Sequence, residues 1–168
     1  MKFEIETWTH NATLRAKSSN IEKNEIKKYV SIWDSMVKFL KDPKNAWVWL
    51  AAPQIWINKR LIAVSLLKSY DDEIYKTIMM INPEIIEKSS EIEVDNEWCL
   101  SVPKLFWDVA RSKSIKVKFL DEKWKETILL LGSISARIVQ HEIDHLDWIL
   151  FVDKLIKKED ELPPKHVL

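Results

Sequence analysis

The chain has 168 residues, of which 46% are hydrophobic and 31% charged, and its 26 basic and 26 acidic side chains cancel. This composition excludes disordered, collagen-like and disulfide-scaffold proteins. A net charge of zero gives no basis for binding nucleic acid or a membrane surface. The sequence shows no signal peptide and no apolar run long enough to cross a membrane. We therefore expect one cytoplasmic domain over residues 1–168.

The hydrophobic pattern predicts a helix, a series of strands and a second helix. Apolar residues recur at steps of three and four from Ile26 to Leu40, which indicates an amphipathic helix that ends before Pro43. Apolar-rich runs predict strands at 61–67, 75–81, 85–94, 115–120 and 127–131.

The helical period returns from Ser135 to about Asp147, and the charged tail 157–168 is expected to be frayed. The connections at 69–73 and 121–124 have the length of hairpin loops, although Trp124 stands where a left-handed glycine is usual. This order of elements favours an α+β fold, with antiparallel sheets around a central helix and an amphipathic helix near the N-terminus.

The second predicted helix contains the sequence His141-Glu142-Ile143-Asp144-His145. Residues four apart lie on one helix face, so both imidazoles can bind one metal ion, with Glu142 beside a water in the open position. A third ligand could be Cys99, although a lone cysteine is commonly a small buried hydrophobe. Downstream candidates are also available, namely Asp147, Asp153, Glu159, Asp160 and His166.

Three segments together resemble the motifs of the peptide deformylase family, in the family's order and with similar separations. They are Leu50-Ala51-Ala52-Pro53-Gln54, then Glu97-Trp98-Cys99-Leu100-Ser101, and then 140–147, which reads QHEIDHLD. The resemblance covers nearly the whole chain. It implies a metal-dependent hydrolase of the compact bacterial type, which removes the formyl group from the N-terminal formylmethionine of new polypeptides.

The resemblance also implies roles for individual residues. Cys99, His141 and His145 would hold one divalent metal ion, with Fe(II) favoured and Zn(II), Ni(II) or Co(II) as alternatives. Glu142 would transfer the proton of the attacking water, while the Gln54 side chain and the Leu100 backbone N–H would stabilise the oxyanion. N-formylmethionyl nascent peptides are the expected partners, with a transient ribosome contact and a monomeric state.

The resemblance places the methionine pocket and its surroundings at residues that would otherwise be ordinary core positions. Glu97 could pair with Arg137 and so hold the Cys99 segment against the helix, and Phe106 stands where many relatives carry an arginine. The predicted substrate-binding residues are Val48, Trp49, Glu97, Trp98, Ile134 and Ile138.

The chain contains nine tryptophans and one glycine, where usual composition would give roughly twelve glycines. Relatives usually carry glycine at the positions of Trp47, Trp49, Trp98 and Trp148, and Trp56, Trp107 and Trp124 also stand where glycine would be natural. Some bacteria translate the codon UGA as glycine and others as tryptophan. We therefore hypothesise that these tryptophans are UGA-encoded glycines, with Trp8 and Trp33 the weakest members of the set.

Two other functions compete with an active deformylase. Trp49 and Trp98 could fill the cleft and leave a catalytically impaired protein that binds metal or peptide. The HExxH segment alone would also fit a zinc peptidase with a downstream ligand.

Overall fold

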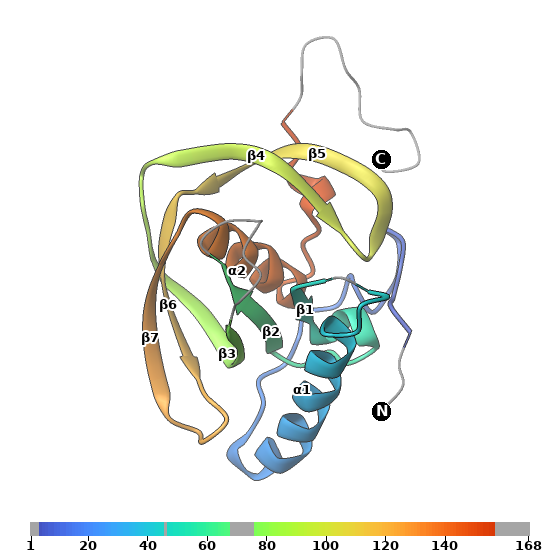
Figure 1. The fold of residues 1–168 in the computed structure, drawn as a ribbon, viewed down its shortest axis with the longest axis vertical. Helices are drawn as coiled ribbons and strands as arrows, with labels where there is room; N and C mark the ends of the chain where they lie inside the picture. Colours follow the sequence, from blue (N-terminus) through green and yellow to red (C-terminus); the bar gives the residue numbers. More distant parts are fainter. Residues whose placement is uncertain (1–3, 46, 68–75, 157–168) are drawn as a thin grey trace.

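The computed structural model describes residues 4–45, 47–67 and 76–156, and Figure 1 shows their arrangement. A five-stranded antiparallel sheet has the order β1-β2-β3-β6-β7, and β4 and β5 form a separate antiparallel ribbon. The main helices and strands are α1 (Ile26–Leu40), β1 (Trp49–Ala51), β2 (Leu61–Leu66), β3 (Lys76–Lys88), β4 (Ile92–Cys99), β5 (Val102–Ser112), β6 (Ser114–Leu120), β7 (Glu126–Gly132) and α2 (Ser133–Leu146). Short 3-10 helices are η1 (Lys23–Glu25), η2 (Ala52–Ile55) and η3 (Phe151–Lys154).

The two α-helices pack on opposite faces of the five-stranded sheet. Because side chains alternate along a strand, Ile62 and Val64 of β2 join the core cluster that includes α2, while Leu61 and Ala63 join the cluster that includes α1. All four side chains are fully buried. Both faces of β2 are therefore buried over residues 61–65, and α2 is held in the interior of the fold.

The β4–β5 ribbon arches over α2 on the side away from α1, as Figure 1 shows. A register shift lies between Glu97 and Cys99, where the ribbon pairs Glu97 with Trp107 but Cys99 with Val102. Such irregularities re-aim side chains. Here Glu97 and Cys99 are both buried, at 4% exposure each, at the end of β4 that lies next to α2.

The first predicted helix is confirmed with the same bounds, Ile26–Leu40. The second begins at Ser133, two residues earlier than expected, and ends at Leu146. The predicted antiparallel strands at 61–67, 115–120 and 127–131 are confirmed within one residue at each end.

The prediction of one strand over 85–94 is wrong, because this run holds the end of β3 and the start of β4. Around the break, Ser89 N–H donates to the Ser114 carbonyl and Lys113 N–H to the Glu91 carbonyl. The chain thus leaves one sheet for the other at this point. The predicted hairpin connection at 69–73 and the tail 157–168 lie outside the described residues.

None of the helices in the described part of the chain has the length and apolar character that a membrane span requires.

Candidate metal centre

Cys99, His141 and His145 bring one ligand atom each to the same place in the interior. These three atoms lie within 4.8 Å of one another, and all three residues are buried. The Cys99 Sγ is 3.2 Å from Nε2 of His145. Strand β4 supplies the thiol, and α2 supplies two histidines one helical turn apart. This donor set and spacing fit a single divalent transition-metal ion.

Glu97 fixes the orientation of His141. Its Oε2 lies 3.0 Å from Nδ1 of His141, so the ring presents Nε2 to the opposite side. The same carboxylate accepts two hydrogen bonds of 2.8 Å from Arg111 and one of 2.8 Å from Arg137. A carboxylate on the outer nitrogen is the usual support for a metal-binding histidine.

Several buried polar atoms around the ligands have no hydrogen-bond partner. They are Nε2 of His141, Nδ1 of His145 and both carboxylate oxygens of Glu142. Unpaired polar atoms in a protein interior are costly, so the neighbouring Nε2 of His141 and Glu142 carboxylate indicate a group that would satisfy them. A metal ion with its water fits Nε2 of His141 and the Glu142 carboxylate, whose Oε1 is 4.0 Å from that nitrogen.

The electrostatics of the site follow from its burial. Burial, with the nearby Glu142 carboxylate, raises the pKa of Cys99 to about 12. Burial also raises the pKa of Glu142 well above its usual value, and burial together with His141 lowers the pKa of His145. The thiol is therefore protonated and His145 neutral at neutral pH, and a metal that binds Cys99 would displace the thiol proton.

Gln54 lies beside the thiol, at the end of η2 that follows β1. Its Oε1 accepts a 2.8 Å hydrogen bond from the Ala51 N–H, which directs the amide nitrogen toward the site. That nitrogen is 3.2 Å from Oγ of Ser101 and 3.5 Å from Sγ of Cys99. Leu100 follows Cys99 directly at the end of β4. An amide donor is thus fixed next to Cys99, one of the three candidate metal ligands.

The sequence profile described as polypeptide deformylase matches residues 3–161. The chain belongs to this family. Its members are metalloenzymes that remove the N-formyl group from nascent peptides.

Named deformylases resemble the chain over most of its length. The peptide deformylase of Synechocystis sp. is 37% identical over 134 residues, which cover 77% of this chain and 71% of the relative. That of Pseudothermotoga lettingae is 41% identical over 142 residues, covering 83% and 75% of the two chains.

Solved deformylase structures have the same fold as this chain. A probable peptide deformylase from Synechococcus phage S-SSM7 has a TM-score of 0.81 at 38% identity, over 92% of this chain and 100% of its own. A class I type b peptide deformylase from Acinetobacter baumannii, bound to Met-Ala-Ser, has a TM-score of 0.82 at 33% identity, over 92% and 99% of the chains.

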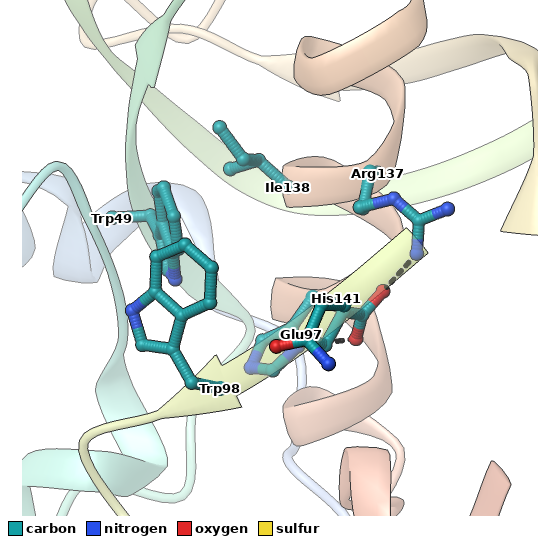
Figure 2. Close-up of a pocket in the computed structure, with 7 residues that line it drawn as sticks. Trp49, Glu97, Trp98, Arg137, Ile138 and His141 are labelled. Carbon is teal, nitrogen blue, oxygen red and sulfur yellow. Dashed lines mark hydrogen bonds and ion pairs between the residues drawn. The ribbon is translucent and has the colours of Figure 1, made fainter. Parts of the chain in front are cut away.

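A small pocket adjoins His141 in this deformylase, and Figure 2 shows it. Among the residues predicted to bind substrate, Trp49, Glu97, Trp98 and Ile138 line this pocket. Val48 and Ile134 do not line it and instead pack, partly buried, against the core cluster that contains Ile138. The space open to the centre of a water molecule is about 20 Å³, which is room for roughly one water.

The downstream carboxylates offered as alternative ligands are engaged elsewhere. Asp147 pairs with Arg60 at 2.6 Å, and Asp153 pairs with Arg15 at 2.5 Å. Glu159, Asp160 and His166 lie outside the described residues. In the described part of the chain, the grouped ligand atoms are those of Cys99 and the two histidines.

Sequence reasoning predicted the Glu97–Arg137 pair, which the hydrogen bond confirms, but missed Arg111 and Ser101. Arg111 bridges Glu97 to Asp144, and Ser101 donates its N–H to Sγ of Cys99 at 3.4 Å. No sequence signal links Arg111 to Glu97, because their contact depends on the pairing of β4 with β5.

Proposed function

We propose that this deformylase binds its metal ion through Cys99, His141 and His145, and that the whole chain forms one deformylase domain. The ion we propose is Fe(II), with Zn(II), Ni(II) and Co(II) as alternatives for the same donors. When bound, the metal supplies Lewis-acid activation of the water and of the formyl oxygen. The grouped ligand atoms and the unpaired Nε2 of His141 are the observations that support this assignment.

Glu142 is the proposed general base and acid. It is fully buried, and neither carboxylate oxygen has a partner in the protein, so both are free to hold a proton. Its raised pKa, caused by burial, brings the carboxyl nearer the pKa that suits proton transfer at neutral pH. Glu142 would accept a proton from the attacking water and deliver it to the leaving amine.

Gln54 and the Leu100 N–H are the proposed oxyanion donors. The formyl oxygen gains negative charge when water attacks, and donors fixed in advance stabilise that charge. The Gln54 amide is fixed by the Ala51 N–H and is directed toward Cys99. Arg111 and Arg137 do not contact the oxyanion in this proposal; they hold Glu97 against His141.

We propose N-formylmethionyl nascent peptides as substrates, met in the cytoplasm by a monomer in transient contact with the ribosome. The Met-Ala-Ser peptide bound in the Acinetobacter relative supports peptides that begin with methionine. Trp49, Glu97, Trp98 and Ile138, with Val48 and Ile134 behind them, are the proposed residues around the methionine.

A metal-binding protein without turnover is the second candidate, and one observation favours it. Trp49 and Trp98 lie with ring centroids 6.2 Å apart beside His141, where they leave room for about one water.

The test is formate release from formyl-Met-Ala by protein loaded anaerobically with Fe(II). Formate release supports the deformylase, and metal binding without formate supports the second candidate. A peptidase would instead cleave an internal peptide bond.

A further inference from the structure

Four tryptophans adopt a backbone conformation that suits glycine. Trp8, Trp56, Trp124 and Trp148 have φ angles of 82°, 66°, 63° and 56°. Tryptophans are nine of the 168 residues, yet they are four of the seven non-glycine residues with positive φ in the described ranges. A bulky side chain is an outlier in this region, because its Cβ crowds the neighbouring carbonyl.

The hydrogen bonds around these positions are those of motifs in which glycine is the standard residue. Trp148 is the second residue after α2, and the following Ile149 N–H returns to the Asp144 carbonyl at 2.9 Å, as in a Schellman motif. Trp124 ends a tight hairpin loop, with its N–H on the Asp121 carbonyl at 2.9 Å. Trp56 is the left-handed cap of η2.

Packing does not account for three of these four indoles, whereas Trp124 is partly buried against the core cluster that includes α1. The exposed fractions of Trp8, Trp56 and Trp148 are 62%, 65% and 46%. Large apolar side chains that are this exposed gain little from burial while their backbones remain strained. By contrast, Trp33 lies in α1, and Trp107 donates its indole N–H to the Ile156 carbonyl at 2.8 Å.

Three more tryptophans cluster beside the candidate metal centre. Trp47, Trp49 and Trp98 have ring centroids 5.7 to 6.3 Å apart, and Trp49 and Trp98 line the small pocket beside His141. Figure 2 shows the Trp49 and Trp98 rings facing the space next to His141. The space beside His141 holds about one water and is too small for a methionine side chain, while a larger hollow of about 270 Å³, lined in part by Trp47 and Trp98, adjoins Cys99.

We infer that positions 8, 47, 49, 56, 98, 124 and 148 carry glycine in the protein that the cell makes, encoded by UGA codons translated as glycine. For positions 8, 56, 124 and 148 the inference rests on backbone geometry alone. For positions 47, 49 and 98 it rests on the proposed function, because glycine there would open the space above the metal ligands. The inference leaves out Trp33 and Trp107, and so narrows the sequence hypothesis at both positions.

The codons and the protein itself test this inference. We expect UGA at the seven positions, UGG at 33 and 107, and tryptic peptides with glycine at the seven positions when the protein is isolated from the cells that encode it. UGG codons at 8, 56, 124 and 148, or native peptides with tryptophan there, would overturn the inference.

Recombinant chains give a second test. Replacing Trp8, Trp56, Trp124 and Trp148 together by glycine should raise the melting temperature by about 10 °C, since each relieves a strained backbone. The matched control, Trp33→Gly with Trp107→Gly, should lower it. A fall in melting temperature with the fourfold change would contradict the inference.

Activity separates this inference from the proposed function. Replacing Trp47, Trp49 and Trp98 by glycine, in addition to the four substitutions above, should raise formate release from formyl-Met-Ala at least tenfold over the all-tryptophan chain. If the all-tryptophan chain is equally active, the inference for the cleft fails and the function stands. If the seven codons are UGA and the glycine chain binds Co(II) but releases no formate, the function fails and the inference stands.

Discussion

The Glu97 carboxylate holds Nδ1 of His141 at 3.0 Å while it is itself held by Arg111 and Arg137. All four side chains are buried, so the histidine ring cannot turn without breaking a network of charged groups. Hydrogen bonds from Arg111 and His141 outweigh burial and hold the pKa of Glu97 far below its usual range. The network thus keeps a full negative charge behind the ligand.

Glu97→Gln should weaken both the fold and the metal site. Neutralising this carboxylate leaves the buried Arg137 without its charge partner and Arg111 with Asp144 alone, which costs about 3–5 kcal/mol of unfolding free energy. The loss of support for His141 should lower metal affinity by about 10–100-fold. Urea unfolding and competition with a metal chelator measure the two effects. Glu91→Gln, which removes an exposed ion pair with Lys113, is the control and should change neither. Unchanged metal affinity in Glu97→Gln would contradict the role of Glu97.

Metal affinity should rise with pH because of Cys99. Burial raises the pKa of this thiol to about 12, so it is protonated at neutral pH and must lose its proton to bind metal. The lowered pKa of His145 means that this ring is already neutral and releases no proton. The Co(II) association constant should therefore increase about tenfold per pH unit from about pH 7.5 to 9. In Cys99→Ala the affinity should fall and this slope should disappear; a slope that persists would exclude the thiol as a ligand.

Gln54→Ala should reduce turnover without removing the metal. The amide of Gln54 is directed toward the site but is not one of the grouped ligands. Loss of one oxyanion donor typically lowers kcat by about 10²–10³-fold. Steady-state formate release, with Co(II) absorption as the measure of metal content, checks this. Ser101→Ala, which removes only the hydroxyl partner of the amide, is the matched control and should have a smaller effect. Equal kcat values for Gln54→Ala and the parent chain would rule out the proposed role.

Asn82→Ala should destabilise the fold. The Asn82 side chain accepts from the Ile21 N–H and donates to the Ile21 carbonyl, both at 2.9 Å, and its φ of 50° suits asparagine better than alanine. We expect a loss of about 1–3 kcal/mol in the free energy of unfolding. Asn96→Ala, at an exposed position of β4, should change it by less than about 0.5 kcal/mol. Urea titration of both variants gives the comparison, and similar values for the two would refute the prediction.

The sequence predicted the helices better than the strands. A periodic apolar stripe and Pro43 define α1, whereas β1 has only three residues and β5 contains Pro103, Lys104 and Asp108 among its apolar residues. Neither strand has the apolar run or strict alternation by which strands are recognised. The boundary between β3 and β4 within 85–94 could not be recognised in the sequence, because the residues on both sides of it form strands.

The grouping of Cys99, His141 and His145 could be predicted from sequence because the two histidines lie one helical turn apart and the cysteine lies in a recognisable segment. Their support could not be predicted fully. Arg111 reaches Glu97 only because β5 pairs with β4, and the unpaired oxygens of Glu142 become visible only when the interior is assembled. The positive φ angles at Trp56, Trp124 and Trp148 likewise needed the backbone.

Formate release that depends on Glu142 is the most direct test of the deformylase assignment. The chain with glycine at the seven inferred positions, loaded with Fe(II), is compared with its Glu142→Ala variant on formyl-Met-Ala. We expect rapid formate release by the first and a loss of about 10²–10⁴-fold in the variant, with metal content unchanged. Absence of formate from the Fe(II)-loaded chain with the seven glycines, or equal rates for that chain and its Glu142→Ala variant, would contradict the deformylase assignment.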